Sequence, residues 1–253
     1  MITAPISGPI DLKGQVAIVT GAAGDIGRAV SKALVREGAI VAALDLSFKK
    51  ETFSDLLNNE KQIFQYQCDI TKKSQVIKVI DQIVGQHNKV DILVNCAGIV
   101  KLTSLPDISE EEWDRMFLVN VKGPFLVTQA VLPSMKKNRY GKIVNLGSVA
   151  GKAAGVAAGP HYSGSKGAVH TFTKWVARHG GPYGIYANCI APGPCMTTMT
   201  NDFPEGSMDP EKFLLNRSGR PEDIAEAVVF LSSQASNWLT GVILDVNGGL
   251  YLS

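Results

Sequence analysis

A glycine-rich turn near the N-terminus has the residue types that can hold a phosphate group. An apolar run at 16–20 leads into the segment GAAGDIG at 21–27, and a helical pattern follows at 28–37. Glycine lets the chain turn tightly and lets backbone N–H groups approach an anion at a helix N-terminus. A plain glycine-rich turn is the alternative, but the strand before it and the helix after it favour a dinucleotide site. The residues assigned to that site are Gly21, Gly24, Asp25, Ile26 and Gly27.

A carboxylate at the end of the next apolar run indicates which dinucleotide is bound. Asp45 follows Gly21 by 24 residues, and Leu46 comes directly after it. A carboxylate at this place accepts hydrogen bonds from the adenosine ribose and repels a 2′-phosphate. No basic residue follows before Lys49. The pattern therefore predicts NAD rather than NADP, the alternative being a solvated aspartate at a strand end.

The elements that must position these residues follow a regular alternation. Apolar β-prone runs occupy 15–20, 40–46, 62–67, 91–96, 142–147, 186–191 and 241–246, and amphipathic helical segments occupy 25–37, 50–59, 72–87, 109–137, 161–179 and 221–233. The runs are nearly continuous in Val, Ile, Leu and Ala, which is typical of strands buried on both faces. We therefore expect an α/β fold with a doubly wound parallel sheet of about seven strands and helices on both faces.

We find no linker or repeat, so residues 1–253 are expected to form a single domain. The segment 194–219 is harder to assign, because prolines and glycines interrupt it and only 209–216 has a helical pattern. It is longer than an ordinary connection and follows the carboxyl end of a strand, where ligands bind in such sheets. We predict that 194–219 is a lid over the substrate.

Composition excludes several classes of protein. The chain has 253 residues, 45% of them hydrophobic, and its 25 Lys and Arg against 23 Asp and Glu give a net charge of +2. This excludes a disordered chain, and the absence of a basic cluster argues against nucleic acid or a membrane surface as a partner. No apolar stretch reaches about 18 residues and no signal core is evident, so a cytoplasmic protein is expected. The four cysteines and four histidines have no metal-ligand spacing, and no metal site is expected.

Motifs in chain order resemble the short-chain dehydrogenase/reductase family over nearly the whole sequence. Thr20, Gly21 and Gly27 fit the family's T-G-x-x-x-G-x-G turn, with Asp25 in place of the middle glycine. The other matches are CDI at 68–70, NCAG at 95–98, Asn120 in VNVKG, Ser148 after a strand, YSGSK at 162–166, PGPCMT at 192–197 and the closing segment at 240–249. The resemblance implies a Rossmann fold, a nicotinamide cofactor, a small alcohol or ketone substrate and a homotetramer or homodimer.

The resemblance also implies a catalytic tetrad of Asn120, Ser148, Tyr162 and Lys166. Tyr162 and Lys166 are four residues apart on a helical pattern, so both project from one face. Hydride removal from an alcohol leaves a proton that a base must accept. A phenol, whose ordinary pKa is about 10, does this at neutral pH only if a nearby cation stabilises its anion. Ser148 would then bind the substrate oxygen, and Asn120 would hold a water that carries the proton away from Lys166.

Cofactor contacts carry over from the family in the same way. The residues implied are Asp69 and Ile70 at the adenine, Thr197 at the nicotinamide carboxamide, and Asn95, Ala97, Gly98, Tyr162, Lys166, Pro192, Gly193 and Cys195. Two features depart from the family. Ser148 and Tyr162 are 14 residues apart, one more than in common members, which lengthens the loop 149–161 beside the substrate.

The second departure is Asp25, a carboxylate near the expected pyrophosphate. We expect it to face away from the phosphates or to accept a hydrogen bond inside the turn, while Gly24 provides the close backbone approach. Arg28, three residues later on the helix, is the nearest cation that can compensate its charge.

These observations favour an NAD-dependent dehydrogenase that acts on a secondary alcohol or its ketone. Thr, Asn, Asp, Met and Phe side chains of 196–203 suit a polyol, a sugar or a 3-hydroxyacyl chain, and the choice stays open. One alternative is a non-redox dehydratase or epimerase of this fold, which needs a further acid or base such as His161, Asp202 or Glu205. Another is a non-catalytic dinucleotide-binding protein, which would have lost the tetrad.

Overall fold

The computed structural model describes residues 10–54, 62–154 and 158–252. Within them the strands are β1 (Val16–Thr20), β2 (Ile40–Asp45), β3 (Ile63–Gln67), β4 (Ile92–Asn95), β5 (Gly141–Leu146), β6 (Ile185–Pro192) and β7 (Ile243–Val246). They form one parallel sheet in the order β3-β2-β1-β4-β5-β6-β7. The predicted doubly wound α/β fold is confirmed.

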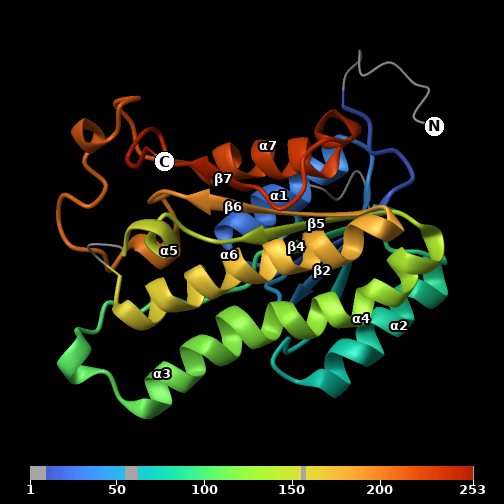
Figure 1. Cartoon of the computed structure of the whole chain (residues 1–253), viewed down its shortest axis with the longest axis horizontal. Coiled ribbons are helices and arrows are strands. Elements are labelled where there is room, and N and C mark those ends of the chain that lie inside the picture. The colour runs from blue at the N-terminus through green and yellow to red at the C-terminus, as the bar shows by residue number, and fades with distance from the viewer. Residues whose placement is uncertain (1–9, 55–61, 155–157, 253) are drawn as a thin grey trace.

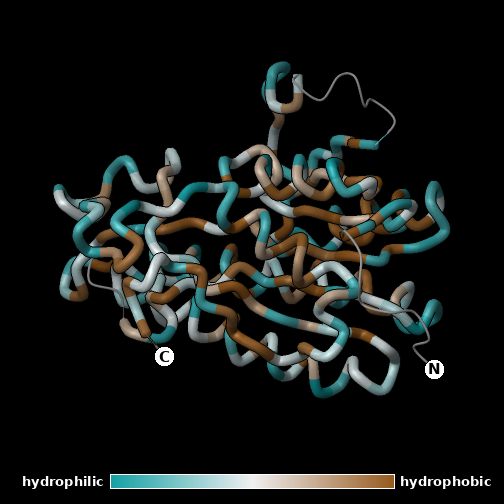
Figure 2. The backbone as a smooth tube through the Cα atoms, turned by 90° about the horizontal axis from the view of Figure 1, so that it is seen from above, coloured by the Kyte–Doolittle hydropathy of each residue, from teal (hydrophilic) through white to brown (hydrophobic). Residues whose placement is uncertain are grey.

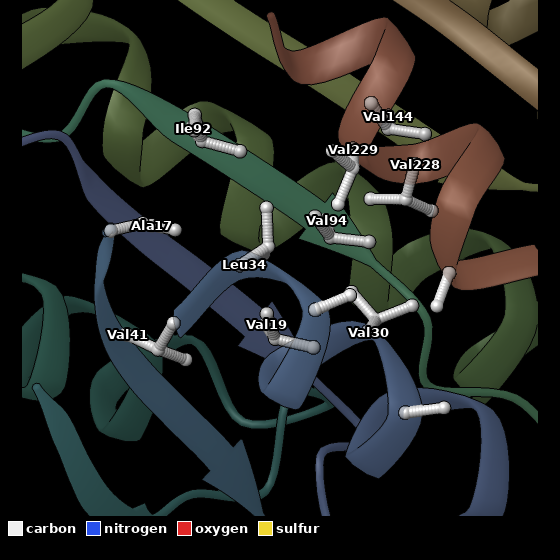
Figure 3. Close-up of a cluster of buried hydrophobic side chains, with 14 of the residues drawn as sticks. Ala17, Val19, Val30, Leu34, Val41, Ile92, Val94, Val144, Val228 and Val229 are labelled. Carbon is white, nitrogen blue, oxygen red and sulfur yellow. The ribbon is translucent and has the colours of Figure 1, made fainter. Parts of the chain in front are cut away.

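Helices cover both faces of this sheet (Figure 1). On one face lie α1 (Asp25–Arg36) and α7 (Pro221–Ser232), and on the other lie α2 (Lys73–His87), α4 (Gly123–Asn138) and α6 (Pro160–Gly180). Figure 3 shows Val30 and Leu34 of α1 and Val228 and Val229 of α7 packed against the sheet. Two shorter helices, α3 (Glu110–Phe117) and α5 (Ala150–Ala153), lie beside the carboxyl ends of the strands.

Most residues of the central strands are apolar because both faces of the sheet are covered. In β1, Val16 and Ile18 belong to the core under α2 and α4, whereas Ala17 and Val19 belong to the core under α1 and α7. None of the four is more than 2% exposed. Figure 2 accordingly shows hydrophobic segments through the middle of the molecule and hydrophilic ones toward its edges.

The order of the strands places a crevice at one edge of the sheet. From β1 the chain proceeds outward to β2 and β3, and it then returns to β4 on the other side of β1. The register pairs Thr20, the last residue of β1, with Asn95, the last of β4. The loops that follow these two ends diverge, and ligands bind at such a reversal point.

The structure differs from the sequence prediction at two helices. The predicted helix at 109–137 is divided by a π-helical segment of five residues, Leu118–Lys122, between α3 and α4. For the predicted helix at 50–59, residues 50–54 form turns, and the remainder lies outside the described residues.

The stretch Glu110–Asn138 is long and apolar enough, by length and composition alone, for a membrane span. It nevertheless packs on the sheet, where Leu126, Val127, Val131 and Met135 are buried in the core. This packing is that of a core helix.

Candidate active site

A cavity of about 1260 Å³ opens at the carboxyl ends of the strands. The proposed site residues on its wall are Gly21, Gly24, Asp25, Ile26, Gly27, Asp45, Leu46, Asp69, Ile70, Ala97, Gly98, Ser148, Tyr162, Lys166, Pro192, Gly193, Cys195 and Thr197. Asn95 and Asn120 lie behind the wall and do not line the cavity. The topology therefore brings together residues that are far apart in the sequence.

Two glycines of the phosphate-binding turn are required by packing. Gly21 has φ +65°, and a Cβ on it would lie 2.7 Å from Ala97 Cα at the end of β4. A Cβ on Gly27 would lie 2.1 Å from the Gly21 carbonyl oxygen. No side chain fits at either position, so both glycines are needed to hold α1 against β1 and β4.

Gly24, by contrast, is not required by the fold. It is exposed, it has φ −77° and ψ 165°, and a Cβ on it would meet only the Gly21 oxygen, at 3.5 Å. This is ordinary backbone and ordinary contact for any residue. What the missing side chain leaves free is the open cavity at the N-terminus of α1, where an anion is stabilised by helix N–H groups.

The Asp45 carboxylate joins the end of β2 to the glycine-rich turn. Its Oδ2 accepts the Ala23 N–H at 2.9 Å, and its Oδ1 accepts the Leu46 N–H at 2.7 Å. These bonds fix a negative charge at the cavity wall, with lone pairs left for a ligand. Arg28 and Lys49 line the same cavity.

Helix α6 presents Tyr162 and Lys166 to the cavity on one face. Lys166 is 6% exposed, and its Nζ donates a hydrogen bond of 2.8 Å to the carbonyl of Leu146, the last residue of β5. The same Nζ lies 5.7 Å from the centre of the Tyr162 ring. The ammonium is thus held near the phenol, which is the arrangement that stabilises a phenolate.

Ser148 follows β5, and its surroundings include a histidine that the sequence analysis did not single out. Its Oγ accepts the Ala150 N–H at 3.1 Å, and its backbone N lies 3.5 Å from His170 Nε2. Burial, with Lys152 and Lys166 adding to it, lowers the pKa of His170 to about 4. The imidazole is therefore neutral at neutral pH. His170 is one helical turn beyond Lys166, and this spacing was the signal for it.

Asn120 lies in the π-helical segment and contacts both the β4 loop and α6. Its Nδ2 donates to Ile99 O at 2.9 Å and to Ser165 Oγ at 3.0 Å, and its Oδ1 accepts the Ile99 N–H at 2.8 Å. A Cβ on Gly98 would lie 3.3 Å from this Oδ1 and 3.5 Å from Lys166 Nζ. Asn120 therefore reaches the neighbourhood of the lysine, while its side chain holds the wall together.

Asn95 has a different environment from the one we expected. It is 2% exposed, and its Nδ2 donates to Thr128 Oγ1 at 3.1 Å and to Asn145 Oδ1 at 2.8 Å. These bonds join β4 to α4 and β5 beneath the cavity. Any effect of Asn95 on a ligand is thus exerted through the wall.

The Asp25 carboxylate bonds outside its own turn. Its Oδ2 accepts the backbone N–H of Thr198 at 2.7 Å and the hydroxyl of Thr198 at 2.8 Å. Thr198 belongs to the segment 194–219, which we call the lid segment. Its ends meet in a bridge between Cys195 and Gly219, and Met199, Phe203 and Lys212 of this segment line the cavity. We expect from the sequence that Asp25 faces away from the phosphates or accepts a hydrogen bond inside its turn, and the bonds that form in the structure come from Thr198 of the lid segment.

His161 does not reach the cavity, although it precedes Tyr162. It is fully buried, with Nε2 3.1 Å from Glu112 Oε1 and its ring beside Trp113. A direct role as a second base is not supported by this position. Among the described residues, no three His, Cys, Asp or Glu side chains group as metal ligands.

Burial raises the pKa of the cavity thiols, Cys68 and Cys195 to about 11 and Cys96 to about 12. These thiols are uncharged at neutral pH, which does not favour a thiolate nucleophile. Leu250 and Tyr251, which follow β7, also line the cavity and were not predicted from the sequence. The parallel sheet could have indicated them, because the residues that follow each strand lie at the same edge of the sheet.

Comparison with known proteins gives a consistent result. The family model for short chain dehydrogenases matches residues 15–207. The 3-oxoacyl-[acyl-carrier-protein] reductase FabG of Thermotoga maritima is 36% identical over 95% of this chain and 99% of its own length. The human (3R)-3-hydroxyacyl-CoA dehydrogenase is 35% identical over 95% of this chain and 97% of its own.

The similarity extends to solved structures. A crystal structure described as that of gox2181 superposes with a TM-score of 0.86 at 31% identity, covering 95% of this chain and 96% of the other. Sequence, fold and cavity lead to the same assignment, and the chain belongs to the short-chain dehydrogenase family of oxidoreductases.

Proposed function

We propose that this protein is an NAD(H)-linked oxidoreductase that interconverts a secondary alcohol and its ketone, with Tyr162 as general acid and base. The observation that carries the proposal is the position of Lys166. Its ammonium lies 2.8 Å from the Leu146 carbonyl and 5.7 Å from the centre of the Tyr162 ring, on a cavity wall that also contains Ser148. This arrangement provides a proton donor, a cation that stabilises the resulting phenolate and a hydroxyl for the substrate oxygen.

The wall of the cavity fits a dinucleotide. Gly24 leaves the N-terminus of α1 open, as a pyrophosphate requires, and Asp45 presents fixed carboxylate oxygens to a ribose. Gly193 and Thr197, which follow β6, line the same cavity, and the family resemblance places the nicotinamide beside them. When bound, this cofactor supplies or accepts the hydride.

The chain's own groups handle the proton. In the direction of reduction, the Tyr162 hydroxyl donates its proton to the substrate oxygen, and Ser148 Oγ holds that oxygen by a hydrogen bond. Lys166 stabilises the phenolate that remains, while its bond to Leu146 O keeps the ammonium in place. His170, neutral and packed behind Ser148, leaves the serine as the uncharged partner of the substrate.

Support for NAD over NADP comes from the Asp45 carboxylate. Two backbone N–H groups hold it at the cavity wall, so it cannot easily turn away from a 2′-phosphate. A charge pair of like sign at about 4 Å costs about 1–4 kcal/mol between water-like and surface-like dielectric values. Arg28 and Lys49 line the same cavity, and their positive charges would attract a 2′-phosphate. The measured preference for NAD over NADP tests whether the repulsion by Asp45 is larger.

Among the substrates left open by the sequence, we propose a 3-oxoacyl or 3-hydroxyacyl thioester. The names of two groups of relatives refer to an acyl chain with an oxygen at C3. The cavity wall also has apolar side chains from several elements, namely Val149, Ala153, Met199, Phe203 and Leu250. These suit an acyl chain better than a polyol or a sugar, whose hydroxyls would lose their hydrogen bonds there.

We further propose a cytoplasmic homotetramer or homodimer that pairs through α4 and α6. Phe125 of α4 is 42% exposed and lies edge-on to Phe172 of α6, and Trp175 of α6 is 57% exposed. Apolar side chains exposed on two adjacent helices favour a contact with a second copy.

A spectroscopic assay tests the proposed function. The protein is mixed with NADH or NADPH and with a 3-oxoacyl thioester, a ketose or a simple ketone, and the loss of nicotinamide absorbance is followed. We expect the highest catalytic efficiency with NADH and the thioester. Turnover of NADPH alone would overturn the cofactor assignment, and no turnover with any ketone would overturn the reaction class.

A further inference from the structure

The link between Asp25 and Thr198 has no counterpart in the reaction described above. We propose that Asp25 is a positioning residue, which holds the lid segment 194–219 across the cofactor site through Thr198. The effect of this link on cofactor binding rests on the proposed function, whereas the hydrogen bonds between Asp25 and Thr198 do not depend on it. Asp25 and Thr198 are 173 residues apart in the chain, and one carboxylate oxygen joins them by two hydrogen bonds of 2.7 and 2.8 Å.

Because Thr198 lies next to residues of the cavity wall, its link to Asp25 can hold that part of the wall in place. Thr198 opens a short 3-10 turn, Thr198–Thr200, and the first N–H groups of such a turn have no partner within it. The Asp25 carboxylate supplies that partner for Thr198. The preceding residue, Thr197, lines the cavity and is the family's expected contact to the nicotinamide amide.

The rest of the turn is closed by its own threonines. Thr200 Oγ1 donates to the Cys195 carbonyl at 2.8 Å, and the Thr200 N–H reaches the Thr197 carbonyl at 3.0 Å. Residues 195–200 therefore behave as one small unit. Fixing this unit at Thr198 fixes Thr197 as well, together with Met199 on the cavity wall.

The same bonds change the electrostatics of the glycine-rich turn. Asp25 is the first residue of α1 and lines the cavity in which a pyrophosphate is expected. An uncommitted carboxylate there would repel the phosphates. Because Oδ2 is bound to two donors of the lid segment, the carboxylate is oriented toward Thr198. The two hydrogen bonds thus reduce the repulsion and at the same time join the lid segment to α1.

Two substitutions at Asp25 separate the hydrogen bonds from the charge. D25N and D25A both remove the negative charge and its interaction with the α1 dipole. Asparagine retains a carbonyl oxygen that can accept both bonds from Thr198, whereas alanine retains none. A difference between these variants therefore reports the link alone. T198V removes only the hydroxyl donor and leaves the backbone N–H.

The first measurement is amide hydrogen exchange of the cofactor-free protein, read on peptides that cover residues 196–201. We expect D25A to exchange at least about threefold faster there than D25N, with T198V between them, because local opening becomes easier. Peptides from β5 and α7 serve as internal controls for folding. Equal exchange in D25A and D25N would overturn the proposal.

The second measurement is the dissociation rate of NADH, followed by nicotinamide fluorescence after mixing with excess NAD. We expect D25A to release NADH about three to ten times faster than D25N, with unchanged thermal midpoints. Slower release from D25A would contradict the positioning role. If the wild type binds neither NADH nor NADPH, the proposed function fails, and the exchange experiment still decides on the link.

Discussion

Lys142 offers a quantitative test of the buried core at the amino-terminal end of β5. This residue of β5 is fully buried, with Nζ 2.9 Å from Asn237 Oδ1, 3.3 Å from Ser236 Oγ and 3.8 Å from the centre of the Tyr186 ring. No carboxylate is among these partners. Burial lowers the pKa of Lys142 from 10.5 to about 8.

The direction of the effect on stability follows from this pKa. The folded state loses its proton near pH 8, whereas the unfolded state keeps it until about pH 10.5. Between these values the unfolded state binds more protons, so Lys142 destabilises the fold at pH 7 and progressively less as the pH rises. The full difference in pKa corresponds to about 3 kcal/mol, which we reduce to about 1–3 kcal/mol for solvent screening and the polar partners.

The assay compares the wild type with K142M by urea unfolding at several pH values from about 7 to 10. The free energy of unfolding of the wild type should rise relative to K142M by about 1–3 kcal/mol over this range. The difference in unfolding free energy between wild type and K142M is used because other groups titrate in both proteins. Burial raises the pKa of Tyr140 to about 12, for example, which lowers the stability of both proteins as the pH rises above 10. A constant difference, or one that falls with pH, would refute the reasoning.

Two further predictions concern the cofactor site. Replacing Asp45 with serine should lower the preference for NAD over NADP by about 2–3 kcal/mol, or about 30- to 150-fold in the ratio of catalytic efficiencies, because the ribose contact and the repulsion are lost together; an unchanged ratio would contradict the role of Asp45. Gly24→Val should raise the NADH dissociation constant at least about tenfold with little change in thermal midpoint, since the backbone at Gly24 accepts any residue and the new side chain enters the cavity. Gly27→Ala, which places a Cβ 2.1 Å from Gly21 O, should instead destabilise the fold, and binding unaffected by Gly24→Val would count against the phosphate site.

Strands were the part of this fold that the sequence predicted best. Each apolar run ends within two residues of its strand, because a strand buried on both faces consists mainly of apolar residues. The glycine-rich turn could be predicted equally well, since Gly21 and Gly27 occupy places where any side chain would overlap backbone atoms. Packing constraints of this kind are local and leave a clear pattern.

The position of Asn120 could not be derived in this way. A π-helical segment at Leu118–Lys122 changes the helical register, and a period of 3.6 residues does not predict where such a segment turns its side chains. Asn95 was assigned to the cofactor site because the segment NCAG at 95–98 resembles a family motif, but its own side chain bonds to Thr128 and Asn145. β4 ends at Asn95, and Ala97 and Gly98 belong to the loop beyond it, so these loop residues reach the cavity wall while Asn95 stays in the sheet.

The partner of Asp25 was also beyond sequence analysis. The part of the lid segment around Thr198 has no periodicity, so nothing in its pattern indicates that Thr198 lies beside the N-terminus of α1. Only the return of β6 to the same edge of the sheet brings these residues together.

The central claim is that Tyr162, assisted by Lys166, transfers the proton. It is tested most directly by the turnover of Y162F with NADH and a 3-oxoacyl thioester, measured beside the affinity for NADH. The substitution keeps the ring and removes the hydroxyl, so the thermal midpoint should change little and the NADH affinity should fall less than about tenfold, as for one lost hydrogen bond, while turnover falls about 10²- to 10⁴-fold. A folded Y162F that binds NADH normally and loses less than about tenfold in turnover would show that Tyr162 is not the acid and base.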